Sequence, residues 1–256
     1  MPGFMKKREA FSAPKAADEI EKIVYDNIKQ FGFKRYGRTL HRFVSEDISQ
    51  LINFQIYDHY LIINIGIRVP ECVERTFTPS EQKKYYHEYE CNIRSELGAV
   101  RGKKTEHFNL RRNPLKTSKK ITSELTKTVL PVFNILCSRE AILTHRREYP
   151  LFDVTGSHLI LLDEAMIYGR LGNTEKAKEL FKEHYNNAVR KYKSLEENGR
   201  RYYLKKGEEI SFKGQNIIAE KNGYVTVYGA SSGHIEYLDR LALKIGIWQS
   251  NDEQTT

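Results

Sequence analysis

The chain of 256 residues has few cysteines, and the three that it has do not form a recognised pattern. Cys72, Cys91 and Cys137 are far apart in the sequence, and none belongs to a CxxC pair. A disulfide framework requires an even set of cysteines and a zinc site requires paired ligands, so neither is indicated. We expect no metal and no cofactor, and a reducing compartment, the cytoplasm, as the location.

Long hydrophobic runs are absent too. No stretch approaches the roughly 18 apolar residues that a membrane-spanning helix needs. The basic residues near the N-terminus are not followed by the apolar core of a secretory signal. We therefore expect a protein that is not exported and has no membrane partner.

Recognised catalytic motifs are also missing. The stretch GAVRGKK (98–104) lacks the spacing of a phosphate-binding loop and the Ser or Thr that follows its lysine. Asp58 and His59 are adjacent at a predicted turn, but a catalytic dyad would need a nucleophile and an orienting third group. The sequence therefore favours a function without catalysis.

Positive charge is what the chain has in excess. The 42 Lys and Arg residues outnumber the 33 Asp and Glu residues, which gives a formal net charge of +9, and such a surface favours anionic partners. Residues 94–120 hold nine of the basic residues and two acidic ones, together with the Gly, Asn and Pro of a loop. We interpret this segment as a basic loop that joins two halves of the chain, and 190–206 is a second basic stretch.

Hydrophobic periodicity predicts an α+β fold. Apolar side chains recur at helical spacing over 17–31, and Gly32 ends that helix. Residues 33–70 are predicted to form three strands, a capping pattern at 78–81 a short helix, and the alternation at 89–93 a fourth strand. We expect an N-terminal helix on a four-stranded antiparallel sheet, followed by a helical half with an inserted β-hairpin.

The second half of the chain has mainly helical periodicity. Asn222-Gly223 lies between β-rich runs and is the strongest short hairpin signal in the chain. The expected organisation is a flexible N-terminus (1–14), an α+β sheet subdomain (15–110), a mainly helical subdomain (111–248) with a hairpin near 208–229, and a disordered tail (249–256).

The register of the central hairpin can be predicted from its loop. If Asp58 and His59 form a two-residue loop, Ile52 lies opposite Ile65 and Asn53 lies opposite Asn64. One face of the hairpin is then apolar, and a three-residue loop at 45–47 extends the pattern to the preceding strand. The opposite face would carry five polar residues: Thr39, His41, Asn53, Gln55 and Asn64.

This polar face is the best candidate site in the sequence. A row of Asn and Gln side chains offers both donors and acceptors to a small polar ligand or to the backbone of a partner. The alternative is that the amides bond to one another and to water. The candidate binding residues are Asn53, Gln55, Asn64, His41, Arg38 and Arg42, of which the two arginines would add a preference for anions.

Four stretches in order resemble a known family: GFKRYGRTLHR (32–42), QLINFQ (50–55), INIGI (63–67) and ECNIRSELG (90–98). Together they are similar to a bacterial family known as domain of unknown function 4304, over roughly residues 15–170. The resemblance implies an α+β domain in a bacterial cytoplasm and brings no activity. The inserted tail around 196–230 departs from the family pattern.

We expect a non-catalytic recognition protein with a protein partner, for example in toxin immunity or as an accessory in defence, by analogy with other small α+β domains. One alternative is a nucleic-acid-binding protein that uses segments 94–120 and 190–206. Another is an enzyme with a site on the polar sheet face. In the nucleic-acid alternative the phosphate contacts would come from Lys103, Lys104, Arg111 and Arg112.

Overall fold

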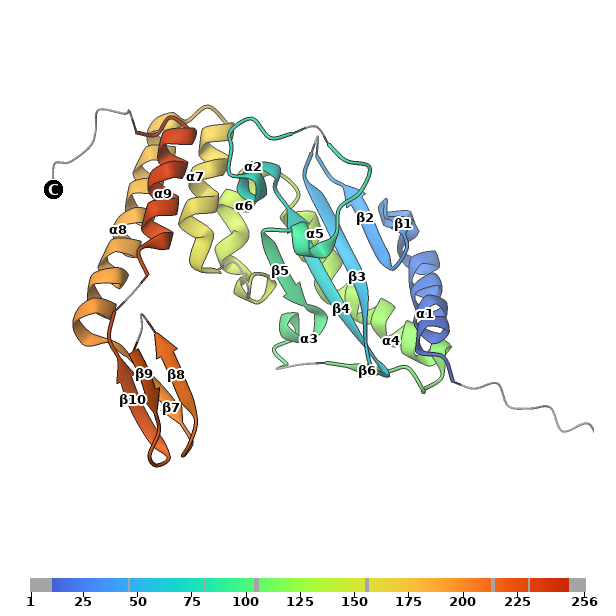
Figure 1. Ribbon diagram of the computed structural model, residues 1–256. Coiled ribbons are helices and arrows are strands. Elements are labelled where there is room, and N and C mark those ends of the chain that lie inside the picture. Colours follow the sequence, from blue (N-terminus) through green and yellow to red (C-terminus); the bar gives the residue numbers. More distant parts are fainter. Residues whose placement is uncertain are drawn as a thin grey trace, which may run out of the picture. The chain divides into compact units, whose positions relative to one another are not determined.

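The computed structural model divides the chain into two compact units, Met1–Asp163 and Glu164–Thr256. The division falls within helix α7 (Ile160–Arg170), whereas the sequence placed a boundary near residue 110. The predicted tail at 249–256 and most of the predicted flexible N-terminus lie outside the described residues. The structure describes residues 11–45, 47–80, 82–103, 106–154, 157–212, 215–229 and 231–248 (Figure 1).

The first unit begins with helix α1 (Ala13–Ile28). Ser12 caps this helix, because its side chain accepts a hydrogen bond from the backbone N–H of Lys15. After a 3-10 turn, Gly32 adopts a φ of 88° and ends the helical segment, as the sequence predicts. The buried residues of α1 recur at helical spacing and face the sheet: Ala17, Ile20, Val24 and Ile28.

An antiparallel sheet lies against α1, so the predicted fold class is confirmed. Within the described residues it has six strands, in the order β1-β2-β3-β4-β5, with β6 paired to β4. Two of them are short strands that the sequence reading missed, and β1 arises because the chain turns at Gly37 with a φ of 58°. The strands are β1 (Lys34–Tyr36), β2 (Thr39–Phe43), β3 (Ser49–Tyr57), β4 (Tyr60–Arg68), β5 (Ile93–Glu96) and β6 (Phe108–Asn109).

Helices cover the apolar face of this sheet. Helix α1 packs against β3 and against α4 (Pro114–Glu124). A π-helical turn (Leu125–Val129) joins α4 to α5 (Leu130–Ile135). This wider turn directly precedes Pro131, where the sequence predicts a kink, because proline cannot donate a hydrogen bond to the preceding turn.

Three local predictions in the first unit are wrong. The described residues at 78–80 are not helical, and the helix in this region is instead α2 (Pro70–Glu74). The fourth strand begins at Ile93, later than expected, because Glu88–Glu90 forms a 3-10 turn capped by His87. The basic segment 94–120 is not a loop between halves, since it contains part of β5, helix α3 (Leu97–Val100), β6 and the first turns of α4.

The second unit combines helices with two small strand pairs. Helix α8 (Thr174–Asn198) follows the turn at Gly172-Asn173, and α9 (Gly233–Lys244) packs against α8. The hairpin predicted near 208–229 contains β8 (Glu209–Phe212) and β9 (Gln215–Ile218), which pair with each other.

Asn222-Gly223 is not the hairpin turn that its sequence predicts. Strand β10 (Gly223–Val227) starts at this glycine and pairs with β7 (Arg200–Leu204), across the inserted β8–β9 hairpin. The Asn222 side chain accepts a hydrogen bond from the backbone N–H of Lys206 at 2.7 Å. Asn222 therefore closes the open end of the β7–β10 pair instead of turning the chain.

Candidate functional site

The polar face of the main sheet has the register that the sequence predicts. Strands β3 and β4 meet at the Asp58-His59 loop, with Ile52 opposite Ile65 and Asn53 opposite Asn64. Strand β2 extends the pattern, since Thr39 lies opposite Asn53. The structure therefore brings the five predicted polar residues to one face.

The amides on this face bond to their neighbours. The side-chain amide of Asn53 donates to the hydroxyl of Thr39 at 3.0 Å, and that of Asn64 donates to the side-chain oxygen of Gln55 at 2.8 Å. Asn64 is buried, Asn53 is half-buried and Gln55 is exposed. The amide groups of Asn53 and Asn64 thus find hydrogen-bond partners within the sheet. Gln55 and part of Asn53 remain accessible to a ligand.

His41 is enclosed in aromatic side chains. Its ring lies 4.5 Å from that of Phe43 and 6.1 Å from that of Tyr36, centroid to centroid, and 2% of the residue is exposed. Its Nε2 has no hydrogen-bond partner among the residues that the structure describes. Burial lowers the pKa of His41 to about 4, so the ring is neutral at physiological pH.

The two candidate arginines have different partners. Arg42 points to the helical side of the sheet, where its guanidinium donates to the backbone oxygen of Phe31 at 2.7 Å and to the side chain of Asn134 at 3.0 Å. The expectation that it joins the amide row is therefore wrong, because it alternates with His41 along the strand. Arg38 lies at the turn before β2 and donates to Asp18 at 2.7 Å.

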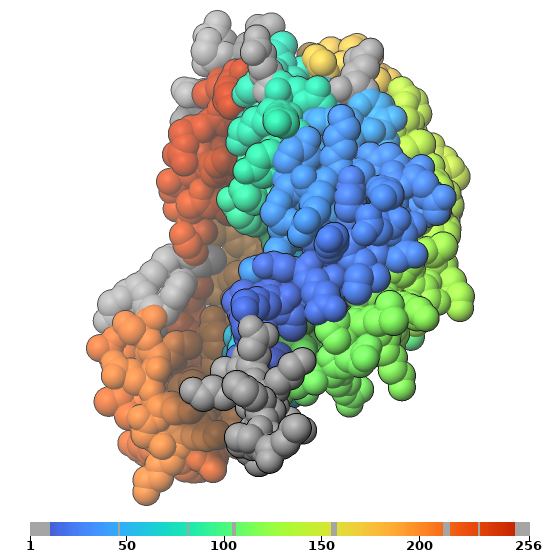
Figure 2. Space-filling view, turned by 90° about the vertical axis from the view of Figure 1, so that its right-hand side faces the viewer, coloured from blue at the N-terminus to red at the C-terminus, as the bar shows by residue number. Residues whose placement is uncertain are grey.

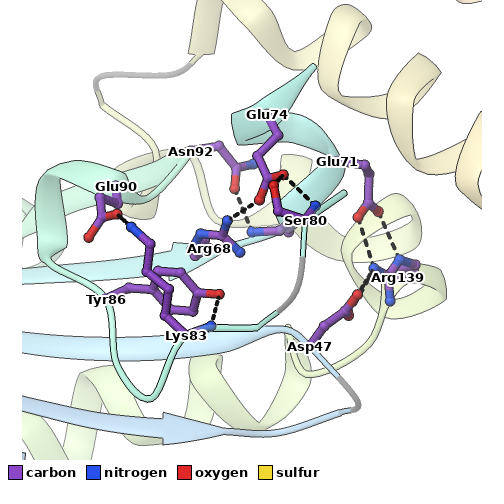
Figure 3. Close-up of polar contacts among 11 residues, drawn as sticks. Asp47, Arg68, Glu71, Glu74, Ser80, Lys83, Tyr86, Glu90, Asn92 and Arg139 are labelled. Atoms are coloured by element: carbon purple, nitrogen blue, oxygen red, sulfur yellow. Dashed lines mark hydrogen bonds and ion pairs between the residues drawn. The ribbon is translucent and has the colours of Figure 1, made fainter. Parts of the chain in front are cut away.

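Residues 82–92, which we call the strap, run over one end of the polar face (Figure 3). The Tyr86 ring lies 3.9 Å from the guanidinium carbon of Arg68, and its hydroxyl accepts a hydrogen bond from the backbone N–H of Lys83 at 2.9 Å. Tyr86 and Cys91 form a buried cluster with Leu51 of the sheet. The strap therefore closes this end of the face to ligands.

Glycine is required beneath the strap. A Cβ atom at Gly66 would lie 2.6 Å from the sulfur of Cys91, which is closer than such atoms approach in proteins. Beside the strap, Glu74 accepts hydrogen bonds from Arg68 at 2.6 Å and from the Ser80 hydroxyl at 2.6 Å, which anchors the chain that leads to it (Figure 3). The C-terminal end of the strap is thus packed closely on β4 at Gly66.

Beside the strap, the polar face borders a groove of about 700 Å³. The residues that line it come from the β1–β2 turn, the amide row, the strap and α1. Figure 2 views the molecule from the side of α1, β1 and β2, which are blue. The lining residues are Asp18, Arg35, Tyr36, Gly37, Arg38, Thr39, Asn53, Tyr85 and His87.

Aromatic rings form one wall of this groove. Tyr36 and Tyr85 are stacked, with centroids 4.8 Å apart and planes 10° apart. His87 meets Tyr85 edge-on at 5.5 Å, and Tyr89 stacks on His87 at 5.1 Å. The strap therefore turns Tyr86 towards the sheet and presents its exposed rings beside the groove.

Ion pairs fix the opposite wall. The Arg35 guanidinium donates to Glu21 of α1 at 2.6 Å, and the Glu21 side chain is fully buried. Burial raises the pKa of Glu21, although Arg35 acts in the opposite direction. The Arg38–Asp18 pair is exposed on both sides, so a ligand can compete for Arg38 more readily than for Arg35.

Sequence reasoning found three lining residues of the groove, Arg38, Thr39 and Asn53, and missed most of the others. Asp18 and Arg35 gave no signal, because their roles depend on the packing of α1 against the sheet. The predicted residues Gln55 and Asn64 lie on the same face but outside the lining.

The predicted nucleic-acid residues differ in the contacts that they make. Lys103 pairs with Glu106 at 3.2 Å, and the guanidinium of Arg111 lies 5.3 Å from the centre of the Phe11 ring. Arg112 is exposed, and Lys104 lies outside the described residues. In the part of the chain that the structure describes, no group of three His, Cys, Asp or Glu side chains is placed to hold a metal ion.

The helices were also compared with the requirements for a membrane span. None of those formed by the described residues has the length and the apolar character that crossing a bilayer requires.

The comparison with protein families supports the resemblance seen in the sequence. A comparison with curated proteins and with solved structures returns no match. The model of a domain of unknown function (DUF4304) matches residues 24–135. This range is narrower than the predicted 15–170, but it includes all four stretches that carry the resemblance and extends from within α1 to the end of α5. The matched region holds the whole sheet, so the similarity to the DUF4304 family concerns the sheet and the helices that cover it.

Proposed function

We propose that this protein acts by non-catalytic recognition of a protein partner, and that the groove at the end of the polar face is its contact site. The observation that carries the proposal is the stacked pair Tyr36 and Tyr85 beside the arginines 35 and 38. Tyrosine and arginine are enriched at the energetic centres of protein interfaces. A bacterial cytoplasmic protein that neutralises a toxin by covering its site would be one instance.

The arrangement of the groove fits recognition better than catalysis. His41, the histidine of the predicted face, is sealed between aromatic rings and is not part of the lining. Asp18 is engaged by Arg38. Asn53 keeps donors and acceptors at the floor, which suits a partner's backbone.

The test compares a double variant with a matched control. Arg38→Ala/Tyr85→Ala removes the arginine whose carboxylate partner is exposed and one ring of the stack, whereas Tyr57→Ala removes a tyrosine that is 65% exposed and does not line the groove. Each immobilised protein is exposed to nuclease-treated bacterial lysate, and retained proteins are quantified by mass spectrometry. A specific partner should be retained by the wild type and by Tyr57→Ala and lost from the double variant.

Equal retention by all three proteins would refute the proposal. Thermal unfolding of each variant checks that the loss of a partner does not reflect loss of the fold. Since both substituted side chains are partly exposed, only small changes in stability are expected.

A further inference from the structure

The strand pair β7–β10 of the second unit presents an outward face that its own packing does not use. Tyr203 lies opposite Tyr224, and Arg201 lies opposite Thr226. The alternating residues Leu204 and Val227 are buried. The pair therefore has one face with the buried Leu204 and Val227, which Arg200 and Tyr202 share, and an outer face with Arg201, Tyr203 and Tyr224.

The rings on the outer face are accessible to a ligand. Tyr203 is 54% exposed and Tyr224 is 66% exposed, and Tyr228, directly after β10, is 54% exposed. Tyr203 and Tyr224 meet edge-on with centroids 5.3 Å apart. The guanidinium carbon of Arg201 lies 4.9 Å from the centre of the Tyr224 ring, so charge and ring surface are combined at one place.

Segment 190–206 runs from the end of α8 into β7 and supplies positive charge without carboxylate partners among the described residues. Segment 190–206 contains seven basic residues, and none of them forms an ion pair with the residues that the structure describes. All seven are exposed. They are Arg190, Lys191, Lys193, Arg200, Arg201, Lys205 and Lys206.

We propose that this outward face binds single-stranded nucleic acid. Exposed rings can stack on unpaired bases of any sequence, and nearby free cations attract the phosphate backbone. The many lysines argue against a protein-binding centre, because lysine is depleted at the cores of such interfaces. This proposal goes beyond the groove of the first unit and does not depend on it.

The first experiment measures the stacking contribution in the full chain. Fluorescence anisotropy follows the binding of a labelled oligothymidylate of about 20 nucleotides and of a duplex of equal length at about 50 mM salt. The single strand should bind more tightly than the duplex, and Tyr224→Ala should weaken it by roughly 5- to 100-fold. Tyr57→Ala, with a tyrosine of matching exposure in the first unit, should bind as the wild type does.

The second experiment locates the electrostatic contribution. Lys205→Glu/Lys206→Glu should reduce both the affinity and its dependence on salt, whereas the equal charge change Arg111→Glu/Arg112→Glu should alter the affinity less than about threefold. All four side chains are exposed, so these variants should fold.

Three results would overturn the assignment. These are undetectable oligonucleotide binding at low salt, wild-type affinity of Tyr224→Ala, and equal losses for the two charge reversals. If oligonucleotides do not bind but the wild type retains a nuclease-resistant protein that Tyr224→Ala does not, the face is a protein-binding surface instead.

Discussion

The two basic segments of the chain look alike in sequence and differ in how their charges are used. In segment 94–120, Glu106 alone accepts contacts from Arg101 at 2.5 Å, Lys120 at 2.8 Å and Lys103 at 3.2 Å. In segment 190–206, no basic side chain has a carboxylate partner among the described residues. Charge density in a sequence therefore does not reveal how much charge is available to a partner.

Removing the carboxylate of Glu106 should reduce this difference between the two segments, and we expect it to have the largest effect on stability. Burial opposes ionisation of Glu106, but hydrogen bonds from Lys120, Arg101 and Lys103 outweigh it and lower its pKa to about 2. Glu106→Gln should decrease the free energy of unfolding by about 2–3 kcal/mol at neutral pH, measured by urea titration. Because the variant has one negative charge fewer, it should also elute later from a cation exchanger.

The pH dependence of stability provides an internal check on this prediction. The pKa of Glu106 is lower in the folded protein than its ordinary value of 4.5, so the stabilisation is complete above pH 4.5 and is lost as the pH falls towards 2. Glu106→Gln should lose that part of the pH dependence. A variant as stable as the wild type at pH 7 would show that the ion pairs contribute nothing net.

Gly199→Ala should have a somewhat smaller effect, confined to the second segment. Gly199 has a φ of 66°, and an added Cβ would lie 2.8 Å from the backbone oxygen of Val227. The substitution should destabilise the junction of α8 with the β7–β10 pair by roughly 1–3 kcal/mol. Faster proteolysis within 200–228, with unchanged cleavage in the first unit, would be the expected result.

If Gly199→Ala leaves the cleavage pattern unchanged, the β7–β10 pair is not anchored by this close approach. Gly207→Ala is a suitable control, because Gly207 also has a positive φ but has no neighbouring atom within 4 Å of the added Cβ. Gly207→Ala introduces the backbone strain of a positive φ without a steric clash, so it should accelerate proteolysis less than Gly199→Ala does.

Single lysine truncations should have the smallest effects. Lys103→Ala removes a partly exposed ion pair and should change the free energy of unfolding by less than about 0.5 kcal/mol. Lys205 has no ion pair with the described residues, so Lys205→Ala should have no measurable effect on stability. A larger loss for Lys205→Ala than for Lys103→Ala in thermal unfolding would reverse our assignment of which segment uses its charge internally.

Local rules were sufficient for the centre of the sheet. The two-residue loop at Asp58-His59 and the alternation of apolar residues determine which side chains share a face, so the neighbours of Asn53 could be predicted. The sequence also indicated helix α1 and its end at Gly32 through spacing and turn chemistry.

The missed features depend on contacts between distant parts of the chain. The groove needs Asp18, Arg35 and Tyr85 to meet, and no local pattern places them together. Asn222-Gly223 has the composition of a tight turn, but pairing of β10 with β7 overrides that preference. Both errors come from treating neighbouring segments as partners when the chain pairs remote ones.

Because Cys91 packs closely against Gly66, the reactivity of its thiol should report how often the strap separates from the sheet. Cys91 is 6% exposed and Cys72 is 1% exposed, whereas Cys137 is only partly buried. Burial raises the pKa of both buried thiols and so keeps them unreactive. With a thiol reagent, Cys137 should react first, Cys91 at the rate at which the strap lifts, and Cys72 only when the first unit unfolds.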